Sequence, residues 1–219
     1  MLTLGNLEIS KLSNESLSQK TISKTQRLLT TSYLKMMEGQ FLDIKYESIK
    51  SITIDEYLRM VNLKTSTLLE CSLMLGIITA NKNNNELISN FSSLGKILGL
   101  IFQIRDDILG IWGTDKTGKH IGADIKRKKK NLPILHVLAN NNSVLSEKVN
   151  KIFSKESITE FDINLIIEIL DKAGSEEYCQ NLINHYWSKG EKIIKTLDIP
   201  SSFKQDFIEL GLYLSVRSS

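Results

Sequence analysis

The chain has 219 residues and a mass of 24.8 kDa, and 41% of its residues are hydrophobic, 24% charged and 7% aromatic. This apolar share excludes an intrinsically disordered chain, and a chain of this length can bury a core without a disulfide or a structural metal. The 28 Lys and Arg residues against 25 Asp and Glu give a net charge of +3, which excludes a general polyanion binder that relies on overall charge.

Two prolines and 12 glycines are too few for a β-sandwich or barrel and favour helices. Cys71 and Cys179 stand alone, so we expect both to be reduced and buried, as is typical of a cytoplasmic protein. The first ten residues lack a basic leader, and the longest apolar runs, residues 73–80 and 98–104, are shorter than the roughly 18 residues of a membrane span. The sequence therefore predicts a soluble, cytoplasmic protein without a signal peptide or transmembrane segment.

Apolar residues recur at helical intervals along most of the chain, with no alternation typical of strands. The first thirteen residues resemble the end of a helix, because they are apolar from the second residue and have no N-cap. Thr53 and Glu56 have the spacing of a capping box, and the polar run 81–85 predicts a loop. We predict one all-α domain over residues 1–219, with later helices at about residues 15–38, 53–80, 86–112, 131–139, 162–172, 176–196 and 203–216.

The densest group of polar residues lies between Phe102 and Pro133. Asp106 and Asp107 stand in an apolar helix, and Gln103 precedes them by three and four residues, the spacings that bring helical side chains together. Two adjacent carboxylates in a buried helix require a cation, and Mg²⁺ prefers such oxygen ligands. The alternative is that both aspartates are solvated or paired with Arg105 and nearby lysines.

A glycine-containing loop with Lys119 and Gly122 follows, then Asp124 and the basic run 126–130. Glycines beside lysines can clamp a phosphate group. The alternatives are a nuclear-localisation or nucleic-acid patch and a plain solvated helix start. The short run and the small net charge argue against nucleic acid as a partner.

Two further polar pairs lie upstream. Gln40 and Asp43 are three residues apart, at the predicted end of the first long helix. Lys64 and Thr65 interrupt an otherwise apolar helix. A surface lysine whose aliphatic stem covers apolar neighbours is the alternative interpretation of Lys64.

Taken together and in this order, these segments resemble the trans-isoprenyl diphosphate synthases, or polyprenyl synthetases. EGQFLD resembles the family's GQxxD segment, KTSTLL its KTxxL segment, and FQIRDDILG its FQxxDD motif. TGKHIGADIKRKKKNLP resembles the GKxxGxD…GKxTLP stretch, and the ending LGLYLSVRSS resembles the family's C-terminus. The resemblance covers nearly the whole chain and implies an isoprenoid-synthase-like helical bundle.

The resemblance also implies roles for individual residues. It makes Asp106 and Asp107 ligands of Mg²⁺, and it places Lys64 and Gln103 with them as catalytic residues. It assigns Asp43 and Asp124 to the supporting shell. The diphosphate-binding residues that it implies are Gln40, Lys64, Thr65, Lys119 and Lys129.

The chain departs from the family pattern at three positions. Gly110 stands where DDxxD has its fifth-position carboxylate, and Lys128 and Asn131 replace the Gly and Thr of GKxT. We expect Gly110→Asp to tighten Mg²⁺-dependent diphosphate binding. The family's first aspartate-rich motif and its basic set for the second substrate would precede residue 1, so we expect an N-terminally incomplete bundle. Its open apolar face should form a homodimer or bind a complementing partner chain.

The activity implied is Mg²⁺-dependent condensation of an allylic prenyl diphosphate with isopentenyl diphosphate to a longer all-trans prenyl diphosphate. With only one carboxylate cluster, we expect residues 1–219 alone to have little coupling activity. Two alternatives remain open: a non-catalytic accessory subunit of a heteromeric synthase, and a class I terpene cyclase of similar architecture.

Overall fold

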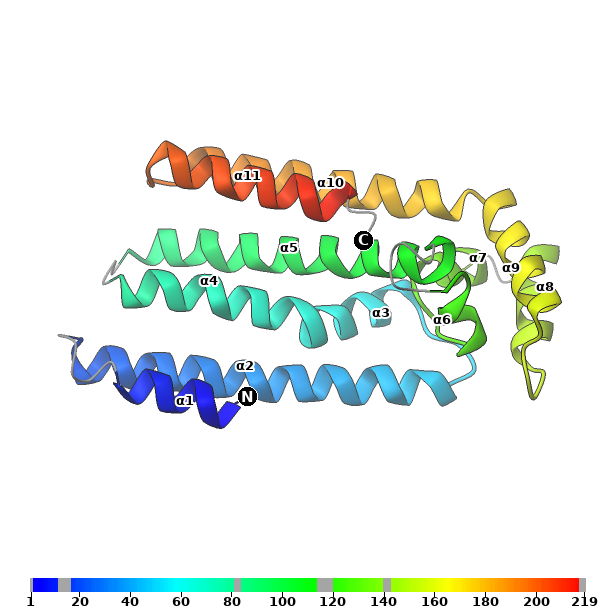
Figure 1. Ribbon diagram of the computed structural model, residues 1–219, viewed down its shortest axis with the longest axis horizontal. Coiled ribbons are helices and arrows are strands. Elements are labelled where there is room, and N and C mark those ends of the chain that lie inside the picture. The colour runs from blue at the N-terminus through cyan, green and yellow to red at the C-terminus, as the bar shows by residue number, and fades with distance from the viewer. Residues whose placement is uncertain (1, 12–16, 81–83, 114–119, 140–142, 217–219) are drawn as a thin grey trace.

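The computed structural model describes residues 2–11, 17–80, 84–113, 120–139 and 143–216, and within these ranges every regular element is a helix. The prediction of an all-α fold is therefore confirmed (Figure 1). The elements are α1 (Leu2–Lys11), α2 (Gln19–Ser48), α3 (Ile54–Val61), the π-helical turn η2 (Asn62–Ser66), α4 (Thr67–Thr79), α5 (Asn85–Trp112), α6 (Ala123–Lys126), α7 (Leu132–Leu138), α8 (Val144–Phe153), α9 (Glu160–Lys172), α10 (Ser175–Thr196) and α11 (Ser201–Val216).

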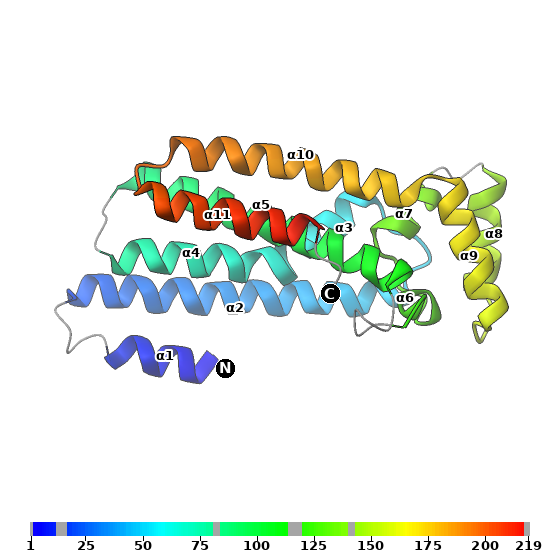
Figure 2. The same ribbon diagram turned by 45° about the horizontal axis from the view of Figure 1, so that its top comes forward.

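The long helices α2, α4, α5, α10 and α11 run along the long axis of the molecule, and α6–α9 gather at one end (Figures 1 and 2). Helix α5 packs against α4 on one side and against α10 and α11 on the other. Its apolar residues Leu94, Leu98, Ile101 and Ile104 are completely or almost completely buried. The main core therefore surrounds α5, which also carries Gln103 and Asp107.

A second, smaller core lies among α6–α9 and includes Ile125, Val149 and Ile166. Helix α7 connects the two cores, because Leu132 and Leu135 belong to the main core and Ile134 to the smaller one. This shared helix fixes the smaller unit against the C-terminal part of α5.

Most predicted helices are confirmed, as is the capping box of Thr53 and Glu56 at the start of α3. The predicted helix end near residue 38 is wrong, since α2 continues to Ser48 and Gln40 and Asp43 lie within it. The predicted helix 53–80 is divided by η2, and helices α6 and α8 were not predicted. Of the predicted loop 81–85, residues 81–83 lie outside the described residues.

By length and composition alone, Ile54–Thr79 and Asn85–Trp112 are long and apolar enough to cross a membrane. Of the most apolar window in the second stretch, 61% is buried inside the bundle, as is typical of a core helix. In the first stretch the buried share is 28%. Cys71 and Cys179 are free and buried, as predicted.

Candidate functional site

Lys64 and Thr65 lie on the π-helical turn η2, which is wedged between α2 and α5. Gly39 of α2 and Gly99 of α5 make this close approach possible. A Cβ atom at Gly39 would lie 2.3 Å from the backbone N of Lys64, and one at Gly99 would lie 2.4 Å from Cα of Ser66. Single π-helical turns inside α-helices often mark functional sites. Here the turn holds Lys64 and Thr65 against the neighbouring helices.

The two side chains of this turn have partners on different helices. The Lys64 ammonium donates a hydrogen bond to Asp43 Oδ2, on α2. The Thr65 hydroxyl donates to Gln103 Oε1 on α5 at 2.8 Å. The turn therefore joins the upstream polar pair on α2 to the aspartate-containing segment of α5.

Asp107 is the centre of a buried hydrogen-bond network, and its solvent exposure is 0%. Its Oδ2 atom accepts hydrogen bonds from the Tyr57 hydroxyl at 2.5 Å and from the backbone N–H of Leu132 at 3.0 Å. Its Oδ1 atom accepts from Gln103 Nε2 at 3.0 Å. Burial raises the pKa of Asp107, although the Lys129 ammonium and these hydrogen bonds act in the opposite direction.

Lys129 lies between two carboxylates. Its Nζ atom is 3.8 Å from Asp107 Oδ1 and 3.6 Å from Asp124 Oδ2. Burial alone would lower the pKa of Lys129, but Asp107 and Asp124 raise it above its ordinary value. Asn131 supports this pair, because its Nδ2 donates to Asp124 Oδ2 at 3.0 Å while its Oδ1 accepts from Ile134 N at the start of α7.

A polar cavity and an apolar groove meet at Lys64. The cavity is small, and Lys64 lines it together with Asp43, Gln103, Asp107 and Lys129. The groove is more open and mainly apolar. Its lining residues are Met36, Gln40, Lys64, Thr65, Leu68, Leu69 and Phe102. Lys64 thus places an ammonium group at the end of an apolar groove, which suits a ligand whose anionic end meets Lys64 and whose hydrocarbon tail lies along the groove.

The structure places most of the residues singled out in the sequence around this junction. Gln40 is exposed beside the groove, and Asp106 is half-buried and does not line the cavity. Lys119 lies outside the described residues. Those brought together through contacts or a shared cavity are Asp43, Lys64, Thr65, Gln103, Asp107, Asp124 and Lys129.

The basic run does not form one continuous anion-binding surface. Lys128 donates to the backbone carbonyls of the 155–156 turn, and Lys130 to those of Tyr46 and Glu47 at the end of α2. Lys126 is 3.8 Å from Glu160 and largely exposed. Lys129 and Lys130 are the members of the run that line the cavity.

Tyr57 is a residue of the site that the sequence analysis did not single out. Tyr57 is 1% exposed, and burial and the Asp107 carboxylate raise its pKa well above its usual value. The available signal was chemical, since a buried tyrosine hydroxyl usually has a hydrogen-bond partner.

The described residues do not form a protein-only metal site. Among them, no group of three or more His, Cys, Asp or Glu side chains is placed to hold a metal ion. Asp107 accepts three hydrogen bonds from protein donors, and Gly110 offers no carboxylate. Asp107 therefore holds Tyr57, Gln103 and the start of α7 together, and its expected role as a Mg²⁺ ligand stays a prediction.

Comparison with known proteins gives a consistent result. A family model described as polyprenyl synthetase matches residues 4–170. The geranylgeranyl diphosphate synthase of Mycobacterium tuberculosis (strain ATCC 25618 / H37Rv) is 34% identical over 155 residues, which are 70% of this chain and 44% of that protein. The chain spans about half the length of the curated relatives it matches.

Solved structures share the fold. A geranylgeranyl pyrophosphate synthetase from Pyrococcus horikoshii Ot3 superposes with a TM-score of 0.83 at 28% identity, covering 92% of this chain and 61% of that one. A geranylgeranyl pyrophosphate synthase from Corynebacterium glutamicum, solved with isoprenyl diphosphate and magnesium, gives a TM-score of 0.84 at 25% identity, covering 94% of this chain and 58% of that one.

Proposed function

This chain belongs to the polyprenyl synthetase family, and from that premise we propose that its site binds a prenyl diphosphate for condensation with isopentenyl diphosphate to a longer all-trans product. The diphosphate would lie at the cavity lined by Lys64 and Lys129, with Thr65 and Gln40 beside it. The hydrocarbon chain would follow the apolar groove towards Leu68 and Leu69.

The observation that carries this proposal is the position of Lys64, which lines both the polar cavity and the groove. A cation at the junction of an anion site and an apolar channel orients a ligand with one charged end. The Thr65–Gln103–Asp107 hydrogen bonds hold this junction in place before a ligand binds.

Calorimetric titration tests the proposal by measuring the contributions of the diphosphate group and of the hydrocarbon chain separately. Farnesyl diphosphate should bind the wild-type chain at least about tenfold more tightly than inorganic pyrophosphate, because each buried CH₂ group contributes roughly 0.8 kcal/mol. Lys64→Ala should weaken both ligands and Leu68→Gln only farnesyl diphosphate. Lys126→Ala, at an exposed lysine, is the control. Equal affinities for the two ligands, or equal effects of all three variants, would contradict it.

We also propose Mg²⁺ as the cofactor, bound together with the diphosphate. Mg²⁺ sites commonly combine one or two carboxylates with substrate phosphates and water, so the lack of a protein-only site in the described residues is compatible with this. Asp106 is the carboxylate of the motif that is partly exposed. When bound, the cation would neutralise charge on the diphosphate; Lys64 and Lys129 would orient the same group.

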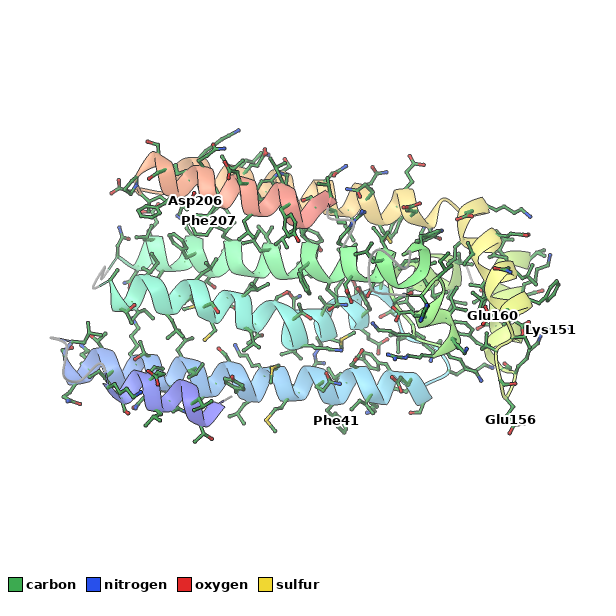
Figure 3. All side chains as sticks on the ribbon, in the orientation of Figure 1. Phe41, Lys151, Glu156, Glu160, Asp206 and Phe207 are labelled. Carbon is green, nitrogen blue, oxygen red and sulfur yellow. The ribbon has the colours of Figure 1, made fainter. Side chains whose placement is uncertain are left out.

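A partner chain is the next part of the proposal. Four apolar residues of α2 are between 59% and 64% exposed and follow the a/d spacing of a coiled-coil seam: Leu34, Met37, Phe41 and Ile44. Figure 3 shows Phe41 pointing outward from the bundle. We propose that this seam forms the interface of a homodimer or the binding surface for a complementing chain. We also propose that the protein is cytoplasmic. Phe41→Lys should reduce association measured by light scattering, and an unchanged mass would contradict this.

The accessory-subunit alternative is favoured by one observation: Asp107 accepts three hydrogen bonds from protein donors, and Gly110 supplies no carboxylate. A radiolabelled coupling assay decides between the two. We expect residues 1–219 alone to show little coupling activity. An enzyme-derived complementing chain should restore coupling, and Lys129→Ala should then abolish it if this site is catalytic. Full restored activity with Lys129→Ala would instead identify an accessory subunit.

A further inference from the structure

Gly110 leaves a space in α5 that another side chain fills. A Cβ atom at this position would lie 2.3 Å from Asp124 Oδ2 and 2.7 Å from Asp124 Cγ. Real Cβ atoms essentially never approach a neighbour so closely. The carboxylate of Asp124 therefore occupies the volume that a side chain at position 110 would need.

Asp124 is fixed in that space from several directions. Its carboxylate accepts a hydrogen bond from Asn131 Nδ2 at 3.0 Å and lies 3.6 Å from Lys129 Nζ. Gly122, whose φ of 68° is in the left-handed region, turns the backbone just before Asp124, and the residue as a whole is 8% exposed. The backbone carbonyl of Asp124 also accepts a hydrogen bond from the N–H of Lys129, which returns the chain towards the cavity.

We infer that Asp124 is a positioning residue for Lys129. We also infer that Gly110 is required for this role, because the lack of a side chain at position 110 leaves room for the Asp124 carboxylate. The inference rests on the proposed function, in which Lys129 binds diphosphate. Asp124 and Asp107 hold the ammonium from two sides, so Lys129 stays at the cavity. A side chain at position 110 displaces Asp124 and removes one of the two ion pairs of Lys129.

This arrangement changes what Gly110→Asp should do. The sequence alone suggests that an aspartate there restores a metal-binding carboxylate. In the structure, the new side chain takes the position of the Asp124 carboxylate and places a like charge beside it. The variant should therefore loosen Lys129 and weaken diphosphate binding, which is the opposite of what the sequence alone predicts.

The test combines two measurements on the full chain. Brief acetylation with acetic anhydride, read by mass spectrometry, reports labelling of Lys129 relative to Lys126, whose side chain is 67% exposed. Gly110→Ala and Asp124→Asn should each raise this ratio about fivefold, the factor that corresponds to about 1 kcal/mol of ion-pair free energy. Gly76→Ala is the matched control, because a Cβ there meets nothing within 4 Å in another helix.

A double variant, Gly110→Ala with Asp124→Ala, distinguishes an effect on the position of Lys129 from a general effect of the alanine on helix packing. It is measured by thermal unfolding. Gly110→Ala should raise the melting midpoint in an Asp124→Ala background, as Gly76→Ala does, and should fail to do so in the wild-type background. Lys129 should remain highly labelled in the double variant. Wild-type labelling in Gly110→Ala, or the same midpoint shift in both backgrounds, would overturn the inference. Failure of the wild-type chain to bind pyrophosphate would instead contradict the proposed function and leave the labelling result standing.

Discussion

Two buried aspartates in different regions of the molecule make similar contacts and have opposite pKa shifts. Asp107, at the centre of the bundle, accepts three hydrogen bonds and faces Lys129. Asp162, in the first turn of α9, is 1% exposed and accepts hydrogen bonds from Lys155 and from the N–H and hydroxyl of Thr159. Burial raises the pKa of Asp107, whereas the hydrogen bonds from Lys155 and Thr159 lower that of Asp162 to about 2.

The difference lies in the surroundings. The neighbours of Asp162, Glu160 and Phe161, are largely exposed, and Figure 3 shows Glu160 at the outer end of the molecule. Asp162 completes the capping box of α9 and so stabilises the helix. Burial makes the charged form of Asp107 unfavourable, and such perturbed carboxyl groups are common at functional sites. In the α9 region, by contrast, hydrogen bonds favour the charged form of Asp162, which stabilises the helix.

The largest expected effect comes from removing the central carboxylate. Asp107→Ala leaves the donors of Tyr57, Gln103 and Leu132 without their acceptor and should lower the free energy of unfolding by about 3–5 kcal/mol. Asp106→Ala, at the adjacent half-buried position, should cost less than about 1 kcal/mol. Denaturant unfolding measures both. Equal losses would show that Asp107 is not the centre of the network.

The next largest effect concerns the contact between α2 and the turn η2, which carries Lys64. Gly39→Ala places a Cβ against the backbone of η2 and should cost about 1–3 kcal/mol, because a backbone cannot move aside as a side chain can. Gly76→Ala, in open space on α4, should instead stabilise by about 0.5–1 kcal/mol through its higher helix propensity. Urea unfolding in which Gly39→Ala is as stable as Gly76→Ala would contradict the close approach of α2 and η2.

A smaller effect is expected where the basic run meets the turn before α9. Lys128 has a φ of 55°, and its ammonium donates to the carbonyls of Lys155 and Glu156. Lys128→Gly and Lys128→Ala both lose these hydrogen bonds, but only glycine relieves the left-handed backbone. Lys128→Gly should therefore be more stable than Lys128→Ala by about 1 kcal/mol in chemical denaturation. The reverse order would place the strain elsewhere.

The last expected effect is a change in pH profile. Asp162 has a folded-state pKa of about 2, below its ordinary value of 3.8, so its contribution to stability is present above about pH 4 and is lost as the pH falls towards 2. Asp162→Asn should flatten this acid limb of the melting midpoint. A wild-type slope in the variant would show that the acid sensitivity arises at other groups.

The sequence predicted the elements that local chemistry determines. Thr53 and Glu56 form their capping box because both partners lie within one turn. The order of polar motifs also identified five of the residues that line the cavity, namely Asp43, Lys64, Gln103, Asp107 and Lys129. It did not predict that α2 continues through Gly39, because the contact of this glycine with η2 depends on a helix that follows later in the chain.

The parts of the site that could not be predicted depend on long-range contacts. Tyr57 and Asp107 are 50 residues apart, and no periodicity relates them. The close packing of the Asp124 carboxylate against Gly110 also depends on the backbone turn at Gly122. Comparison with the family motif alone therefore suggested that Gly110 lacks a metal ligand. In the structure, the Asp124 carboxylate occupies the volume beside this glycine.

The most direct test of the comparison uses one lysine from each region. Lys129 pairs with Asp107, and Lys155 pairs with Asp162. The measurement is the rise in melting midpoint that saturating pyrophosphate produces in wild type, Lys129→Met and Lys155→Met. We expect Lys155→Met to have a lower midpoint but to keep the full pyrophosphate shift, whereas Lys129→Met should lose the shift. An equal shift in the two variants would contradict the assignment of binding to the central region.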